Sequence, residues 1–344
     1  MSVKTVALVE SPAQLLNVVE WAHWARARPS VLVLAPANET SRWQLRTMAQ
    51  VARSAGLTVS WHEPRSGGAA IARTVRALAG DLAGADRLVL GDPFSGVMQV
   101  VVSLVKPSEV TFVDDGTATL ELARQWVAGE HLRRWHQVAT TEQKRHIARF
   151  ARDQIADSLR RRLEPSSGCR LTVFSCLPVE LTQAQVITND YGWLRSQYPK
   201  PVLKLGADLI GTSLVETGVV AEGDYVVAVA SLAVRHRADR YLAHRKESPA
   251  KLARIAALGL RVAIPDRPLE LFLRAGEVGS VVVSFPSTVV HTLPVVLAGT
   301  GVELLVCDIE PSWYTPDTGA HSRRFLGTVT SVARRQHGLA SAAC

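Results

Sequence analysis

The sequence predicts an α/β protein built from two Rossmann-like, doubly wound domains that face a cleft. The chain has 344 residues, and at roughly 150 residues per domain this length accommodates two domains. Short apolar runs rich in β-branched residues alternate with amphipathic segments along most of the chain. Hydrophobic residues make up 47% of the chain and charged residues 20%, a composition that excludes a mainly disordered or collagen-like protein.

The first half of the chain shows this alternation most clearly. Continuous apolar strands separated by amphipathic helices are typical of βαβ units around a parallel sheet that is covered on both faces. Right-handed crossovers make such a domain doubly wound. The predicted strands are Thr5–Val9, Val31–Leu34, Leu57–Trp61, Arg87–Leu90 and Val110–Val113, and the predicted helices are Pro12–Arg26, Ser41–Ala55, Ala69–Ala83 and Gly96–Val105.

The alternation resumes after the turn-like sequence PSSG at 165–168, which we interpret as the domain boundary. We therefore expect an N-terminal domain over 1–165, a C-terminal domain over 169–317, and a final helix and tail over 318–344. The strands predicted after the boundary are Leu171–Ser175, Tyr225–Ala230, Leu260–Ile264, Ser280–Phe285 and Val302–Cys307, and the helices are Pro249–Ala257, Leu269–Ala275 and Ser287–Leu297.

The chain is basic, with 39 Lys and Arg against 31 Asp and Glu and a net charge of +8. A cationic surface favours anionic partners such as phosphate esters, acidic glycans, nucleic acid or anionic lipid. Half of the excess lies in residues 121–165, where Trp126, Trp135 and Phe150 are interleaved with the basic residues. This segment is either a solvated helical face with i,i+4 ion pairs or a surface that meets an anionic acceptor or a membrane.

Cysteine usage and hydropathy bear on the compartment. The four cysteines have no CxxC spacing, and we expect Cys307 to be a buried thiol in a reducing cytoplasm. The N-terminal sequence lacks the pattern of a secretory signal. Residues 278–302 carry no charge and are long enough to span a bilayer. Their Ser, Thr and Pro residues divide them into a strand, a turn, a helix and a further strand, so we expect no membrane span there.

Ligands of doubly wound sheets bind beyond the carboxyl ends of the strands, so the residues that follow strands are the candidates for chemistry. After the first strand, Ser11, Pro12 and Gln14 have the spacing of a helix capping box. Alternatively, Gln14 and Asn17 offer polar groups to a ligand at the N-terminus of that helix. The loop has no GxGxxG pattern, which argues against a dinucleotide cofactor.

After the fifth strand, Asp114 and Asp115 stand next to each other before Gly116. Two interpretations are open. One carboxylate is a helix N-cap whose neighbour lies in solvent, or one is a general base whose pKa the other tunes. No third ligand follows at a short spacing, so we expect no metal site.

In the second half, the segment Gly206–Gly218 has two glycines before Glu216, Gly206 and Gly211, together with hydroxyl residues. This composition suits a loop that a ligand approaches closely. His244 and Arg245 lie at a predicted strand-to-helix junction. An imidazolium and a guanidinium in that place can hold a phosphate, with Lys246 and Lys251 adding charge.

Two further helix starts carry polar residues. Glu270 lies in the first turn of a predicted helix, where it either complements the helix dipole or accepts hydrogen bonds from a nucleoside. Ser287 and Thr288 follow a buried strand and begin the next helix. They are either ordinary caps or part of an anion site.

The order of these motifs resembles that of the bacterial sialyltransferase and polysialyltransferase group, glycosyltransferase families 52 and 38, which share the GT-B fold. The likeness spans about residues 5–295 and is strongest from Gly206 to Leu293. The motifs that carry it are SPxQLLN from Ser11, the Asp-Asp-Gly loop at 114–116, the Gly206–Gly218 segment, YxxHRxE from Tyr241, PxxPxE from Pro265 and the S-F-x-S-T run from Ser284.

The resemblance implies an inverting, metal-independent transferase that moves an acidic sugar, sialic acid or a similar one, from a CMP-sugar to a glycan or lipid-linked acceptor. It implies that Asp115 deprotonates the acceptor hydroxyl and that His244 binds the CMP phosphate and assists its departure. Ser287 and Thr288 would hold the donor phosphate, and Glu270 would contact the nucleoside. No cofactor is expected besides the CMP-sugar, which is the donor substrate.

The expected site is therefore composed of three groups. Its catalytic residues are Asp114, Asp115 and His244, its donor-binding residues are Gly211, Arg245, Glu270, Ser287 and Thr288, and its acceptor-side residues are Gln14 and Asn17.

The expected partners are a nucleotide-sugar donor and a glycan or lipid-linked acceptor, with no nucleic acid. We expect a cytoplasmic enzyme, with membrane contact at the inner face through residues 121–165. Two alternatives stay open, which are a GT-B-like nucleotide-sugar epimerase and a non-catalytic protein that binds an anionic polymer.

Overall fold

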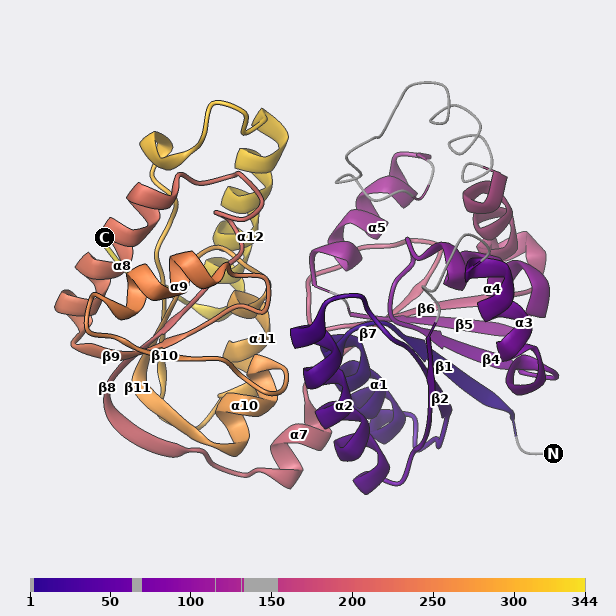
Figure 1. The fold of residues 1–344 in the computed structure, drawn as a ribbon. Coiled ribbons are helices and arrows are strands. Elements are labelled where there is room, and N and C mark those ends of the chain that lie inside the picture. Colours follow the sequence, from indigo (N-terminus) through magenta and orange to yellow (C-terminus); the bar gives the residue numbers. More distant parts are fainter. Residues whose placement is uncertain (1–2, 64–69, 115, 131, 133–153, 344) are drawn as a thin grey trace. The chain divides into compact units, whose positions relative to one another are not determined.

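The structure, a computed structural model, describes residues 3–63, 70–114, 116–130, 132 and 154–343 (Figure 1). The chain divides into two units, Met1–Trp193 and Leu194–Cys344, here called the first and the second unit. Each unit has its own parallel sheet with helices in the connections between strands. The predicted fold class, two Rossmann-like α/β domains, is therefore confirmed.

In its described part, the first unit has a seven-stranded parallel sheet in the order β3-β2-β1-β4-β5-β6-β7. Residues 154–163 are also helical. The strands are β1 (Thr5–Val9), β2 (Ser30–Leu34), β3 (Thr58–His62), β4 (Arg87–Leu90), β5 (Glu109–Val113), β6 (Arg170–Ser175) and β7 (Gln185–Thr188), and the helices are α1 (Pro12–Trp24), α2 (Glu39–Ser54), α3 (Ala70–Leu82), α4 (Gly96–Val105), α5 (Thr117–Val127) and α7 (Gly192–Gln197), which crosses the division between the units.

Burial explains why these strands are continuous apolar runs. All five residues of β1 are buried, because this strand lies in the middle of the sheet and pairs with β2 and β4. Leu8, Leu32, Leu90, Phe112 and Val173 belong to a single buried cluster, to which helices α3, α4 and α5 also contribute. The core therefore requires apolar residues from every one of the central strands.

The second unit has, among its described residues, a six-stranded parallel sheet in the order β10-β9-β8-β11-β12-β13. Its strands are β8 (Val202–Ile210), β9 (Ala238–Leu242), β10 (Arg261–Ala263), β11 (Glu277–Ser284), β12 (Glu303–Val306) and β13 (Ala340–Ser341), and its helices are α8 (Glu222–His236), α9 (Pro249–Ala256), α10 (Leu269–Ala275), α11 (Val289–Val296) and α12 (Ala320–His337).

A buried ion pair lies in the middle of the second sheet. Arg240 of β9 donates from Nε to Oδ1 of Asp208 on β8 at 2.7 Å, and its Nη2 donates to the carbonyl of Glu277 on β11 at 2.8 Å. The other carboxylate oxygen of Asp208 accepts the N–H of Gly279 at 2.8 Å. One carboxylate and one guanidinium therefore connect three neighbouring strands at the point where the register of β8 shifts against β9 and β11.

The boundary between the units lies later than the sequence predicts. β6 pairs with β5, and β7 pairs with β6, so both belong to the first sheet rather than to the second unit. The PSSG sequence forms a short turn of 3-10 helix, Pro165–Ser167, within the first unit. Turn-forming residues mark a reversal of the chain wherever it occurs, so this composition did not identify the domain boundary.

The predicted strand Tyr225–Ala230 is wrong, because these residues lie in helix α8. The run looks uniformly apolar in the sequence because it includes Val227, whose side chain is exposed in the structure. The buried residues of α8 recur at helical spacing, as Tyr225, Val226, Val229 and Leu232.

The predicted Gly206–Gly218 loop is also shorter than expected, since it begins only after β8 ends at Ile210.

Residues 278–302 contain most of β11, helix α11 and the turn before β12, as their Ser, Thr and Pro residues predict. Within the described residues, the helices include none with the length and apolar character needed to cross a membrane. Cys307 is buried as expected, but it is disulfide-bonded, so the prediction of a thiol is wrong. Disulfide formation depends on how close two cysteines come in the fold, which a single sequence does not show.

Replacing Asp208 by Asn should lower the free energy of unfolding of the second unit by about 3–5 kcal/mol, because the buried guanidinium of Arg240 loses its charged partner. Urea unfolding followed by amide hydrogen exchange in β8, β9 and β11 measures this effect. Lys204→Gln is the control, since it removes the exposed ion pair with Glu277 and should leave stability unchanged. Equal effects of the two substitutions would contradict the prediction.

Candidate functional site

The carboxyl edge of the second sheet contains the point where its strand order reverses. Along the chain, β8 is followed by β9 and β10 on one side and then by β11 on its other side. The segments after β8 and β11 therefore flank the switch point at which doubly wound sheets bind ligands. These segments are residues 211–221 and 285–288, and residues 243–248 follow the neighbouring strand β9.

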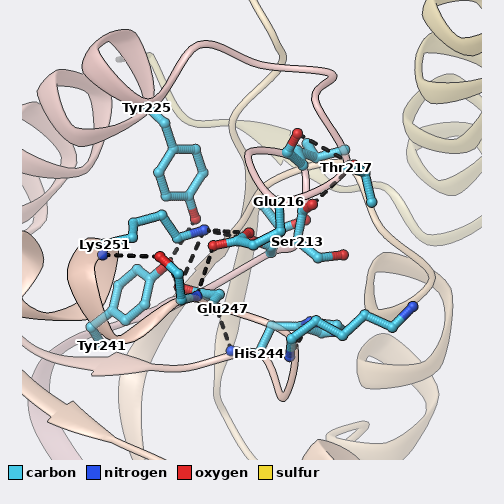
Figure 2. A network of polar contacts seen from close by, with 12 residues as sticks. Ser213, Glu216, Thr217, Tyr225, Tyr241, His244, Glu247 and Lys251 are labelled. Carbon is cyan, nitrogen blue, oxygen red and sulfur yellow. Dashed lines mark hydrogen bonds and ion pairs between the residues drawn. The ribbon is translucent and has the colours of Figure 1, made fainter. Parts of the chain in front are cut away.

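A buried ammonium lies at this edge. The Nζ of Lys251, in the first turn of α9, donates to the carbonyl of Thr212 at 2.9 Å and to Oε2 of Glu216 at 3.0 Å. It also lies 3.4 Å from Oε2 of Glu247 and 4.6 Å from the centre of the Tyr225 ring (Figure 2). Because the side chain is fully buried, these groups replace the water that an ammonium requires.

Glu247 connects this network to the end of β9. Its Oε1 accepts the N–H of His244 at 2.8 Å, and its Oε2 accepts the hydroxyl of Tyr241 at 2.9 Å (Figure 2). The hydroxyls of Tyr241 and Tyr225 are 2.8 Å apart. Burial raises the pKa of Glu247 to about 7, although the charge of Lys251 lowers it.

The prediction that Lys251 adds charge to a phosphate site is wrong, because its ammonium is already surrounded by protein groups. Glu247 was not predicted as a site residue. The i,i+4 spacing of Glu247 and Lys251 is the signal that could have found this pair. Glu216 and Thr212 are distant in the sequence, so no local pattern connects them to Lys251.

Gly211 is a close-approach glycine, as its sequence context predicts, but the group that approaches it belongs to the protein. A β-carbon at this position would lie 2.0 Å from Oε1 of Glu247 and 2.6 Å from the hydroxyl of Tyr241. Any side chain would therefore displace the network. The glycine is required by packing, whether or not a donor also contacts it.

His244 lies between β9 and α9, at the strand-to-helix junction that the sequence predicts. Its Nδ1 accepts the N–H of Lys246 at 3.2 Å. Burial, followed by the charges of Arg245, Lys246 and Lys251, lowers the pKa of His244 to about 3. The expectation of an imidazolium is therefore wrong at neutral pH. The ring is neutral, and since Nδ1 is an acceptor, Nε2 carries the proton and is a hydrogen-bond donor.

Arg245 is half-buried and makes no hydrogen bond or ion pair with the described residues. Glu270 begins α10 and accepts the hydroxyl of Thr292 on α11 at 2.6 Å, so it already has a partner in the fold.

Ser287 and Thr288 lie between β11 and α11, directly at the switch point. Thr288 is the N-cap of α11, but its side chain makes no capping hydrogen bond. The hydroxyl of Ser287 is buried and has no hydrogen-bond partner among the described residues. Seven other buried side-chain atoms of the described residues share this property, among them the hydroxyl of Thr111, but Ser287 is the one that lies between β11 and α11.

In the first unit, the buried carboxylate of Asp114 connects the ends of β5 and β6. Its Oδ1 accepts the hydroxyl of Ser175 at 2.7 Å, and its Oδ2 accepts the N–H of Cys176 at 2.6 Å. Burial raises the pKa of Asp114 to about 6, although these donors lower it. Asn17 on α1 donates to the carbonyl of Asp114 at 2.9 Å and accepts from the side chain of Asn189 at 2.9 Å. The side chains of Asp114 and Asn17 thus hold the carboxyl edge of the first sheet together.

The predicted capping box at Gln14 forms only in part, because its side chain binds the N–H of Glu10 rather than that of the N-cap residue Ser11. The N–H of Gln14 donates to the hydroxyl of Ser11 at 3.2 Å, and its Oε1 accepts the N–H of Glu10 at 2.6 Å. The side chain is buried, and a β-carbon on Gly91 would lie 2.3 Å from its Oε1. The side-chain oxygen of Gln14 is therefore already used as an acceptor within the fold.

Asp115 lies outside the described residues, as does most of the basic segment, residues 131 and 133–153. In the described part of that segment, Arg124 pairs with Glu121 and Glu130, and Arg160 donates to the carbonyls of Glu130 and Trp126. These arginines thus hold helix α5 rather than a ligand. No group of three His, Cys, Asp or Glu side chains within the described part of the chain could hold a metal ion.

Comparison with known proteins yields structures but no family. No protein-family model matches the sequence, and no curated protein is similar to it. A solved structure from Listeria monocytogenes, assigned as a UDP-N-acetylglucosamine 2-epimerase, has a TM-score of 0.48 at 11% identity, over 89% of this chain and 79% of that chain. The UDP-GlcNAc 2-epimerase from Neisseria meningitidis, bound to UDP-GlcNAc, has a TM-score of 0.44 at 12% identity, over 97% and 92% of the two chains.

The prediction of a CMP-dependent sialyltransferase is wrong. No model of that family matches, and the two solved structures named above are described as UDP-N-acetylglucosamine 2-epimerases. At such low identity the likeness concerns the fold alone. The motifs that carried the resemblance are short segments at strand ends, and several of them have roles within the fold, as the contacts of Gln14, Gly211 and Glu270 show.

The stability of the first unit should depend on pH through Asp114. The pKa of this carboxyl is about 6 in the folded state against an ordinary 3.8, so its contribution to stability is present below pH 3.8 and is lost as the pH rises to about 6. The free energy of unfolding of the wild type, relative to that of Asp114→Asn, should therefore fall across this range. Urea unfolding at a series of pH values measures the difference.

The matched control is Asp81→Asn, which changes an exposed carboxylate on α3. Its stability should follow the wild type at every pH. Parallel curves for the wild type and Asp114→Asn would show that the carboxyl of Asp114 has an ordinary pKa and would contradict the prediction.

Proposed function

We propose that the second unit binds the phosphate groups of a nucleotide sugar at the carboxyl edge of its sheet. We further propose that the protein is an enzyme acting on that nucleotide sugar, with epimerisation of the sugar as the reaction. This reading keeps the nucleotide-sugar donor expected from the sequence and replaces the transfer reaction with the alternative that the sequence left open.

The observation that carries the proposal is the buried, unpaired hydroxyl of Ser287. A buried hydroxyl without a partner costs about 1–3 kcal/mol, and Ser287 lies where a ligand could remove this cost, between β11 and α11 at the switch point. Two of the first N–H groups of α11 already have acceptors, since Val290 donates to the carbonyl of Ser287 at 3.3 Å and His291 donates to that of Thr288 at 3.0 Å. The dipole of the helix nevertheless favours an anion at its N-terminus. A phosphate oxygen supplies the acceptor that Ser287 lacks.

The turn after β9 supports the same ligand. His244 offers the N–H of a neutral imidazole, and Arg245 offers a half-buried guanidinium that has no acidic partner in the described part of the chain. A directed neutral donor and a cation suit the oxygens and the charge of a phosphate. β9 is next to β8 in the sheet, so this turn and the switch point belong to the same edge.

The first compound to test is UDP-GlcNAc, which the Neisseria meningitidis structure is described as containing. If it binds the folded state only, a concentration of 100 times its Kd should stabilise the second unit by about 2.7 kcal/mol. Ser287→Ala should weaken binding about tenfold, the effect of losing one hydrogen bond to a charged group. Calorimetric titration measures the affinity of the wild type and of Ser287→Ala for UDP-GlcNAc. Ser331→Ala on α12 is the control.

The reaction is tested by incubating the protein with UDP-GlcNAc and no acceptor. An epimerase converts the sugar under these conditions, whereas a transferase needs a second substrate. Absence of binding by UDP-GlcNAc, UDP, CMP and GDP would refute the nucleotide site. Binding without conversion of the sugar would refute the proposed reaction alone.

A further inference from the structure

We propose that Glu247 is a positioning residue for ligand binding, because its carboxylate fixes the turn that presents the imidazole of His244. The inference rests on the proposed function, since the group that His244 meets is the phosphate proposed above. Three contacts of Glu247 join it to the turn, to β9 and to the buried ammonium of Lys251.

The first contact determines the shape of the turn. Oε1 of Glu247 accepts the N–H of His244 at 2.8 Å, while the N–H of Glu247 donates to the carbonyl of His244 at 2.9 Å. The turn is thus closed from both sides by the same residue. With the backbone held in this way, the N–H of Lys246 reaches Nδ1 of His244 at 3.2 Å and leaves the proton of the ring on Nε2.

The other contacts keep the carboxylate itself in place. Oε2 accepts the hydroxyl of Tyr241 on β9, and it lies 3.4 Å from the ammonium of Lys251. The backbone of Gly211 lies close to the remaining side of the carboxylate, because a β-carbon on Gly211 would collide with Oε1 of Glu247. Glu247 is buried, and these contacts surround its carboxylate (Figure 2).

Lys251 links this arrangement to the switch point. Its ammonium also binds the carbonyl of Thr212 and the carboxylate of Glu216, both in the segment after β8. Glu216 in turn accepts the N–H of Ser248 at 3.0 Å, at the beginning of α9. The turn of His244 is therefore held at a defined distance from the loop that follows β8, which is what a ligand contacting both requires.

The test compares two uncharged substitutions of Glu247, one polar and one apolar. Glu247→Gln keeps an oxygen that accepts the N–H of His244, whereas Glu247→Leu removes it and leaves a side chain of similar size. Leu should weaken the affinity for UDP-GlcNAc about tenfold, while Gln should change it by about twofold or less. Arg254→Met, which removes an exposed ion pair on the same helix α9, is the control and should behave as the wild type.

A second readout does not need the nucleotide. The ¹⁵N signals of the His244 imidazole, assigned with His244→Gln, report which ring nitrogen carries the proton. The wild type and Glu247→Gln should show the Nε2–H tautomer, and Glu247→Leu should lose this preference. A residue that only stabilises the fold would change the unfolding temperature without changing the tautomer.

Each outcome decides the proposal. A folded Glu247→Leu protein with unchanged affinity and an unchanged His244 tautomer overturns it, as does equal loss in Gln and Leu. If the tautomer responds as expected but the wild type binds no nucleotide, the positioning of His244 stands and the nucleotide ligand is refuted. If Glu247→Leu does not fold, Glu247→Met fills the same space with a more adaptable chain, and its result is decisive in the same way.

Discussion

A fully buried ammonium constrains the carboxyl edge of the second unit. Lys251 has no contact with water, and a charge in that position is stable only when protein groups take over its hydration. Those groups come from two loops, because Thr212 and Glu216 follow β8 whereas Glu247 follows β9. Satisfying one ammonium therefore fixes two loops against each other. The space at Gly211 and the turn at His244 are consequences of this arrangement, since both depend on where the carboxylate of Glu247 lies.

The first unit uses a buried carboxylate at the same place in its own sheet. Asp114 follows β5, and it accepts hydrogen bonds from Ser175 and Cys176 at the end of β6. In both units, then, most polar side chains beyond the strand ends serve the fold. This explains why the residue types at these positions gave a misleading picture of the chemistry. At the carboxyl edge of the second sheet, the described groups that remain available include the hydroxyl of Ser287, the Nε2–H of His244 and the guanidinium of Arg245.

Prediction of the elements succeeded where burial is complete and failed where a polar or exposed residue interrupts the pattern. Thr5–Val9 and Arg87–Leu90 are predicted at the bounds of β1 and β4, because these strands are continuous apolar runs. β9 was not predicted, since its sequence contains Asp239 and Arg240, and Arg240 is buried only because Asp208 pairs with it. The candidate positions His244 and Ser287 were found because parallel strands bring their carboxyl ends to one edge. The prediction of a sialyltransferase was wrong, because short motifs at strand ends recur in many doubly wound sheets.

The sequence by itself determined the class of fold, since the alternation of apolar strands and amphipathic helices favours a parallel sheet covered on both faces. It also determined local features such as the partial capping box of Gln14, whose partners are a few residues away. Only the tertiary structure decided which polar groups are used within the fold and which remain for a ligand. Lys251 and Gly211 acquired their roles from Glu216, Glu247 and Tyr241, which lie on other segments of the chain. Burial and charge pairing arise from contacts between segments that are distant in the sequence, and no local pattern encodes them.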